Sequence, residues 1–89
     1  MSKIDKIEEL QNILKENQTN FQVRRQLAVL LLDLGYSEEA KQHFLYLSKI
    51  FPEDSGIFYN LGITYEKLKD LDKAIKAYNK AIELAPDEI

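Results

Sequence analysis

The sequence predicts an all-α protein of five helices, and three observations lead to this prediction. Apolar residues recur at intervals of three and four, as they do along the buried face of an amphipathic helix. Residue size repeats along the chain at the interval that separates the two prolines, Pro52 and Pro86, and we call this interval the repeat period. The 89 residues are 45% hydrophobic and 30% charged, enough apolar material for the core of one domain over residues 1–89.

The first helix is expected within residues 2–17. Ser2, followed three residues later by Asp5, resembles a capping box with Asp in place of the usual Glu. The polar segment 16–20 indicates a loop that follows this helix. One apolar face is formed by Ile4, Ile7, Leu10, Ile13 and Leu14.

Two further units, residues 21–54 and 55–88, are each expected to form a pair of helices. The break between the paired helices is predicted at residues 35–37 in the first unit, where Gly35 suits a left-handed turn, and near residues 69–71 in the second. A shift by one repeat period aligns Leu27 with Leu61, Ala28 with Gly62, Ala40 with Ala74, and Phe44 with Tyr78.

At these aligned positions the two units agree in side-chain size more often than in residue type. Close packing of the paired helices explains this agreement. A bulky residue on one helix of an antiparallel pair needs a small residue facing it on the other. Gly62 on the first helix is therefore expected to admit Tyr78, and Ala74 on the second helix is expected to admit a large side chain of the first, such as Tyr65.

The second unit resembles a tetratricopeptide repeat, a 34-residue unit of two helices. The residues that carry this resemblance are Phe58, Leu61, Gly62, Tyr65, Ala74, Tyr78 and Pro86. The first unit is a divergent copy, with Arg24 in place of the aromatic residue and Leu31 in place of the tyrosine. The helix within residues 2–17 resembles the second half of a preceding unit.

The resemblance implies a right-handed α-solenoid of antiparallel pairs that acts as a protein–protein interaction scaffold. In this family the first helix of each pair lines a concave groove that holds a peptide or helix. By position, the expected peptide-binding groove consists of Arg25, Val29, Leu32, Tyr59, Asn60, Ile63, Glu66 and Lys67. Its apolar floor favours an amphipathic or apolar-anchored peptide.

The carboxylate clamp of one subclass of the family is not expected in full. Val29 occupies a position at which that subclass has asparagine, and a third repeat is missing. Arg25 is still expected to be able to meet a carboxylate of a partner.

An alternative function is assembly through the last helix. Ile75, Tyr78 and Ile82 would form an association face there, without a polar capping helix after them. Two copies would then cover each other as a homodimer, or the chain would continue into further repeats. The ending "APDEI" slightly favours a piece of a longer array.

Several other functions are not expected from the composition. The chain has no cysteine and one histidine, His43, which is expected to be an ordinary helix-surface residue, and no catalytic set, metal site or cofactor motif is evident. A net charge of −3 without a basic stripe argues against nucleic acid. No apolar run is long enough for a membrane span or signal peptide, so a cytoplasmic protein is expected.

Overall fold

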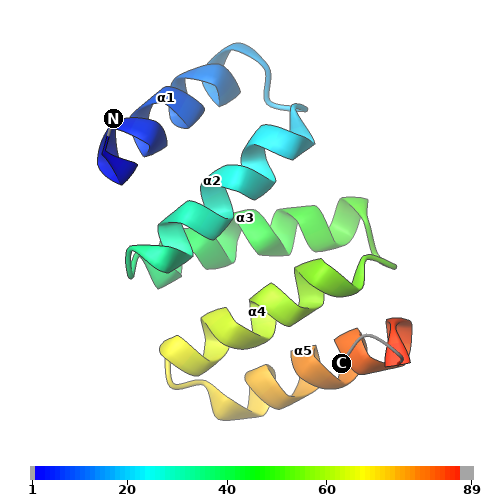
Figure 1. Cartoon of the computed structure of the whole chain (residues 1–89). Helices are drawn as coiled ribbons and strands as arrows, with labels where there is room; N and C mark the ends of the chain where they lie inside the picture. The colour runs from blue at the N-terminus through cyan, green and yellow to red at the C-terminus, as the bar shows by residue number, and fades with distance from the viewer. Residues whose placement is uncertain (1, 87–89) are drawn as a thin grey trace.

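Five helices stacked in chain order make up the described part of the protein. The computed structural model describes residues 2–86. Within them lie α1 (Lys3–Glu16), α2 (Phe21–Asp33), α3 (Ser37–Ile50), α4 (Ser55–Lys67) and α5 (Leu71–Leu84), and no strand. Figure 1 shows the chain running back and forth, each helix packed against its neighbours in sequence. The predicted all-α solenoid of five helices is confirmed, whereas the last residues of the "APDEI" ending, 87–89, lie outside the described part.

Side chains at the start of four helices satisfy backbone N–H groups that the helix itself leaves free. In the predicted capping box, the Asp5 N–H donates to Ser2 Oγ at 3.1 Å and the Ser2 N–H donates to Asp5 Oδ2 at 3.3 Å. Asn20, Asp54 and Asp70 accept in the same way at the starts of α2, α4 and α5. These caps help to fix where the four helices begin.

The turns inside the two helix pairs share one backbone geometry at positions that are one repeat period apart. Gly35 has φ 89° and Lys69 has φ 66°, both in the left-handed region. The N–H that follows each one donates back across the turn, from Tyr36 to the Leu31 carbonyl and from Asp70 to the Tyr65 carbonyl, both at 2.9 Å. This hydrogen bond is typical of an α-helix that ends with one residue in the left-handed conformation. Glycine is the favoured residue at that position.

Lys69 therefore adopts a conformation that costs a residue with a side chain about 1 kcal/mol. We expect Lys69→Gly to raise the free energy of unfolding by about 0.5–1 kcal/mol, because glycine removes that cost. Urea titration followed by circular dichroism measures it. Lys76→Gly, at an exposed position within α5, is the control and should lower stability by about 1 kcal/mol. A loss of stability in Lys69→Gly would contradict the interpretation.

The core runs through the middle of the stack. Its largest fully buried side chains are Phe44, Leu27, Leu31, Leu47, Ile57 and Thr64. Each comes from α2, α3 or α4, the helices that have neighbours on both sides. Burial in this stack therefore depends on having a helix on either side.

The α4–α5 pair shows the expected packing of a ring against a small residue. A Cβ placed on Gly62 would lie 2.6 Å from Tyr78 Cδ1 and 2.9 Å from Tyr78 Cγ. The ring thus occupies the space that any other residue at position 62 would need. Ala74, Ala77 and Ala81 of α5 are buried, so the two backbones approach closely along the length of the pair.

Gly62→Ala tests this contact against helix propensity. Alanine favours a helix over glycine by about 1 kcal/mol, but overpacking a tight contact costs about 1–3 kcal/mol. The clash includes Tyr78 Cγ, the ring atom nearest the backbone, which cannot easily move away. We therefore expect the free energy of unfolding to fall by about 1–2 kcal/mol, measured by urea unfolding. In the Tyr78→Leu background the same change should be neutral or stabilising; an equal loss there would show that Tyr78 is not the cause.

Arg24 stands where the family has an aromatic residue, and its surroundings explain how a cation fits there. Its guanidinium carbon lies 4.2 Å from the centroid of the Tyr46 ring, and its Nη2 donates to the Gln18 carbonyl at 2.9 Å. Its Nη1 lies 3.2 Å from Nδ1 of His43. Since arginine has only donors, this histidine nitrogen is the acceptor. The Arg24 guanidinium thus lies between the Tyr46 ring and two hydrogen-bond acceptors. It takes the place of the aromatic side chain that the repeat motif has at this position.

The expectation that His43 is an ordinary surface residue is therefore corrected. The side chain is half-buried between α2 and α3 and bonded to Arg24. Burial, followed by the neighbouring positive charge of Arg24, lowers the pKa of His43 below its usual value. His43 is thus a neutral structural acceptor in the fold.

Candidate protein-interaction surface

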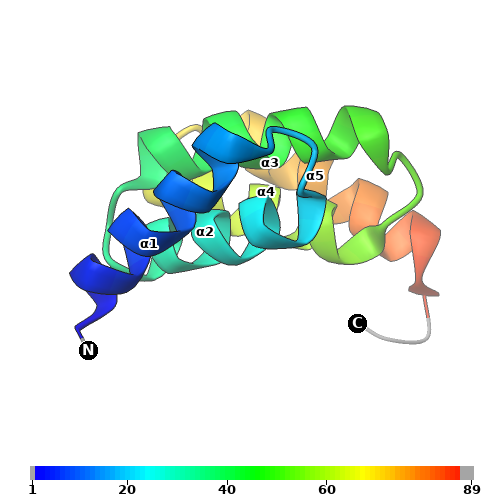
Figure 2. The same cartoon turned by 90° about the horizontal axis from the view of Figure 1, so that it is seen from above.

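The first helices of the two pairs lie on the same side of the stack. Figure 2 shows α2 and α4 along one side and α3 and α5 along the other. We call the outward side chains of α2 and α4 the α2/α4 surface. The residues predicted to line the groove come from these two helices, so the fold brings most of them to one surface.

Apolar side chains are exposed on this surface. Val29 on α2 is 37% exposed and Tyr59 on α4 is 47% exposed. Ile63 and Asn60 beside them are half-buried, and Glu66 and Lys67 are exposed at the end of α4. Exposed apolar side chains thus lie beside polar ones on this surface.

The structure corrects the prediction for Leu32. This side chain is 5% exposed and belongs to the core cluster. Position 32 lies one residue past Leu31, where the apolar stripe of α2 is wide enough to bury both neighbours. Leu32 therefore offers no surface to a partner.

The structure also corrects the placement of Tyr78 on an open association face. Its ring covers Gly62 and lies 5.8 Å from the ring of Tyr59, centroid to centroid. Its hydroxyl donates to Glu66 Oε1 at 2.7 Å. Burial, and then this hydrogen bond, raises the pKa of Tyr78 to about 12. Tyr78 therefore supports Tyr59 and Glu66 from behind, which fixes two members of the α2/α4 surface.

Arg25 has a structural role that its position on the groove did not reveal. Its Nη1 donates to Asp54 Oδ2 at 2.6 Å and its Nη2 to Asp54 Oδ1 at 3.2 Å, a bidentate pair between α2 and the start of α4. Asp54 Oδ1 also accepts from the Gly56 N–H at 3.0 Å and caps α4. One carboxylate thus joins the two helix pairs, and Arg25 already has an anionic partner.

This pair makes the stability depend on pH. Hydrogen bonding to Arg25 lowers the pKa of Asp54 below its usual value. A lowered carboxyl pKa stabilises the fold above the unfolded-state pKa, and this stabilisation is lost as the pH falls through the folded-state pKa. We expect Arg25→Gln to reduce the fall in unfolding free energy between about pH 5 and pH 2, measured by urea titration.

The matched control for this prediction is Lys73→Gln, because Lys73 is the exposed partner of the cap residue Asp70 at 3.7 Å. An exposed pair at that distance contributes little. The control should keep the pH dependence of the parent, and an Arg25→Gln variant that also kept it would refute the role of the Arg25–Asp54 pair.

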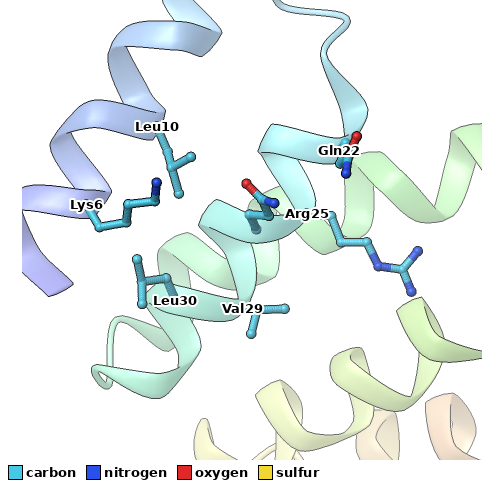
Figure 3. Close-up of a pocket in the computed structure, with 7 residues that line it drawn as sticks. Lys6, Leu10, Gln22, Arg25, Val29 and Leu30 are labelled. Atoms are coloured by element: carbon cyan, nitrogen blue, oxygen red, sulfur yellow. The ribbon is translucent and has the colours of Figure 1, made fainter.

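An open pocket of about 540 Å³ lies between α1 and α2, next to the α2/α4 surface. In Figure 3 Lys6 and Leu10 extend from α1 toward α2, while Arg25 extends away from α1 toward α4. The volume lies in the range of ligand-binding clefts. The lining residues are Lys6, Leu10, Gln22, Arg25, Gln26, Val29 and Leu30.

Sequence reasoning assigned Arg25 and Val29 to the groove, and both also line this pocket; it gave no binding role to Lys6, Leu10 and Leu30. The signal was available in the shift by one repeat period. It places Lys6 on Ala40 and Leu10 on Phe44, two residues that a first helix would cover. We refer to this site as the α1/α2 pocket.

The outer side of α5 also carries exposed apolar residues. Leu71, Ile75 and Ile82 are exposed by 59%, 58% and 44%. Ile75 and Ile82 are two of the three residues predicted for the association face.

Residues 2–86 contain no group of three or more metal-ligating side chains that could hold a metal ion. Among the same residues, no helix combines the length and the apolar character that crossing a membrane requires.

The chain is similar to two curated proteins, one of which is named for a TPR repeat. It is 35% identical over 65 residues to the TPR repeat-containing protein MJ0941 of Methanocaldococcus jannaschii, covering 73% of this chain and 19% of that protein. It is 33% identical over 58 residues to anaphase-promoting complex subunit 3 of Schizosaccharomyces pombe, covering 65% of this chain and 9% of that protein. The chain thus spans less than a fifth of the length of these relatives.

Solved structures share the whole arrangement of helices. MamA from Desulfovibrio magneticus RS-1 superimposes with a TM-score of 0.89 at 26% identity, over 92% of this chain and 46% of that one. YrrB, described as a TPR protein with an unusual peptide-binding site, superimposes with a TM-score of 0.82 at 30% identity, over 89% of this chain and 41% of that one. The model of the tetratricopeptide repeat family matches residues 56–88. Residues 56–88 are therefore a tetratricopeptide repeat, and the helices of this chain form a TPR-like solenoid.

Proposed function

We propose that the chain is a non-catalytic interaction scaffold that binds an apolar segment of a partner protein along the α2/α4 surface and the adjoining α1/α2 pocket. The observation that carries the proposal is the exposure of Val29 and Tyr59 on neighbouring first helices. Exposed aromatic and aliphatic residues beside a pocket are typical of protein-binding sites.

Three further observations support a protein partner. The Tyr59 ring lies 5.8 Å from the Tyr78 ring, centroid to centroid, and this contact favours one orientation of the exposed side chain. YrrB, which shares the fold, is described as having a peptide-binding site. The net charge of −3 disfavours nucleic acid, which requires a basic surface. The family consists mostly of scaffolds without catalytic activity.

Val29→Asp and Tyr59→Ala test the proposal. Both side chains are exposed, so the variants should fold like the parent, and each should weaken binding by more than about 1 kcal/mol because the lost contacts are apolar. Calorimetry measures this with a peptide selected on the parent domain from a displayed library. Lys76→Ala, on α5 away from the surface, is the control. Arg25 is not a suitable test position, because its loss also leaves Asp54 unpaired.

Unchanged affinity in both variants would remove the α2/α4 surface from the proposal.

A second candidate function, assembly through α5, is favoured by the exposed Leu71, Ile75 and Ile82. Its homodimer form requires that Ile75→Glu or Ile82→Glu abolish a dimer seen in sedimentation of the parent. A parent that stays monomeric at high micromolar concentration would exclude the homodimer.

A further inference from the structure

We infer that the protein has a second binding site between α3 and α5, which takes an acidic segment of a partner protein with a large apolar side chain at its centre. The site is an open pocket of about 260 Å³ on the side of the stack along which α3 and α5 lie (Figure 2). The inference goes beyond the proposed function, which concerns the α2/α4 surface. We call the site the α3/α5 pocket, lined mainly by Phe58, Leu61 and Tyr65 of α4 and by Lys73, Lys76 and Lys80 of α5.

The inside of this pocket is apolar. Leu61 of α4 is buried, and Phe58 and Tyr65 on the same helix are half-buried. Leu45 of α3, also half-buried, contributes to the opposite wall. The volume is below the roughly 300 Å³ at which clefts for whole drug-sized molecules begin. The pocket therefore suits a single large side chain, such as phenylalanine, that belongs to a longer partner.

Three lysines of α5 line one flank of the pocket. Lys73, Lys76 and Lys80 follow one another at intervals of three and four, so they lie on one stripe of the helix over about 10 Å. Lys73 Nζ lies 5.8 Å from the centroid of the Tyr65 ring. None of the described residues that line the pocket is acidic. Several carboxylates spread along a peptide match this stripe better than one small anion does.

The neighbouring carboxylates leave these lysines accessible. Lys73 pairs with Asp70 at 3.7 Å and Lys80 pairs with Glu83 at 4.0 Å, and each of the four side chains is at least 40% exposed. Exposed pairs at such distances contribute little, so a partner can replace them. The net charge of −3 does not oppose an acidic partner here, because charges beyond about 8 Å are largely screened at physiological salt.

The preceding repeat lacks this combination, so it is not a general consequence of the fold. One repeat period earlier, Lys73 corresponds to Glu39, and Ala77, which also lines the pocket, corresponds to His43. His43 is half-buried and bonded to Arg24 at 3.2 Å, so its ring fills space that Ala77 leaves open. The pocket that remains between α1 and α3 is about 170 Å³ and has Glu39 on its wall. The larger, lysine-lined pocket is therefore specific to the second repeat.

The probe is a blocked pentapeptide with phenylalanine at its centre and two glutamates on either side. Two matched peptides separate the charge from the apolar side chain. One has glutamine in place of each glutamate, and the other has alanine in place of phenylalanine. Amide chemical shifts of the ¹⁵N-labelled 89-residue chain report where each peptide binds and with what Kd.

We expect the acidic phenylalanine peptide to shift the amides of Ser48, Tyr65 and Ala77, and to bind with a Kd below about 1 mM, the weak end of specific recognition. Each matched peptide should bind at least about fivefold more weakly. The glutamine peptide loses several charge pairs, and the alanine peptide loses the burial of a ring.

Variants of the protein test the same site. Lys73→Gln and Lys76→Gln should each weaken binding of the acidic phenylalanine peptide by about two- to fivefold, the size of an exposed charge pair. Lys67→Gln is the matched control, because Lys67 is an exposed lysine at the end of α4 on the α2/α4 surface, and it should leave the Kd unchanged. Ala77→His places the residue of the preceding repeat in the pocket. It should weaken binding at least about fivefold in a variant whose circular dichroism equals that of the parent.

Four results would overturn the inference. The first is no binding of the acidic phenylalanine peptide at about 1 mM. The second is equal binding of the glutamine peptide, which would remove the role of the lysines. The third is equal binding of the alanine peptide, or an equal loss in Lys67→Gln, either of which would reduce the effect to attraction of any polyanion. The fourth is a set of shifts at Val29 and Tyr59 in place of Ser48 and Ala77.

The proposed function is tested separately. Val29→Asp and Tyr59→Ala lie on the α2/α4 surface, so they should leave the Kd of the acidic phenylalanine peptide unchanged. A failure of those two variants to affect a partner of the α2/α4 surface would therefore leave the α3/α5 pocket standing, and a failure of the pocket would leave the α2/α4 surface standing.

Discussion

Close contact between an aromatic ring on one helix and a residue without a side chain on its partner is the constraint on which the rest of this stack depends. The Tyr78 ring occupies the space above Gly62, so α4 and α5 approach closely enough to bury the three alanines of α5. A helix this rich in alanine buries little apolar area by itself. Its stability in the stack therefore comes from a short distance to its neighbour more than from large side chains.

The contacts that hold the stack together also shape the surface offered to partners. Tyr78 packs inside its pair, yet its ring sets the position of Tyr59 and its hydroxyl holds Glu66. Arg25 lies at the edge of the α1/α2 pocket, yet both of its hydrogen bonds go to the cap of α4. A partner that competed for Asp54 or Arg25 would loosen the junction between the two pairs. Affinity and stability are therefore coupled at this junction, and a ligand that leaves it intact binds at lower cost.

The sequence was sufficient for the parts of the fold that depend on local pattern. Apolar spacing predicted the five helices, and the size of residues at positions such as 62 and 78 predicted the ring above glycine. Contacts between elements were harder to predict. The period placed Arg25 on the expected groove, but a repeating pattern does not reveal a side chain that reaches forward to the cap of the next pair. Leu32 and Tyr78 were misplaced for a related reason. Helical spacing predicts on which face of a helix a residue lies, but it does not predict how far neighbouring helices bury that residue.

The same position in a repeat can belong to the core or be exposed to a partner. Which of the two it is depends on whether a neighbouring helix packs over it. Leu47 is core on α3, which packs against a helix on either side, whereas its equivalent Ile13 is exposed. On α5 the exposed apolar residues are of another kind: Ile75 corresponds to Ile7 and Lys41, which face the neighbouring repeat and not the paired helix. In the described part of the chain, α1 thus lacks its pair and α5 lacks the following first helix.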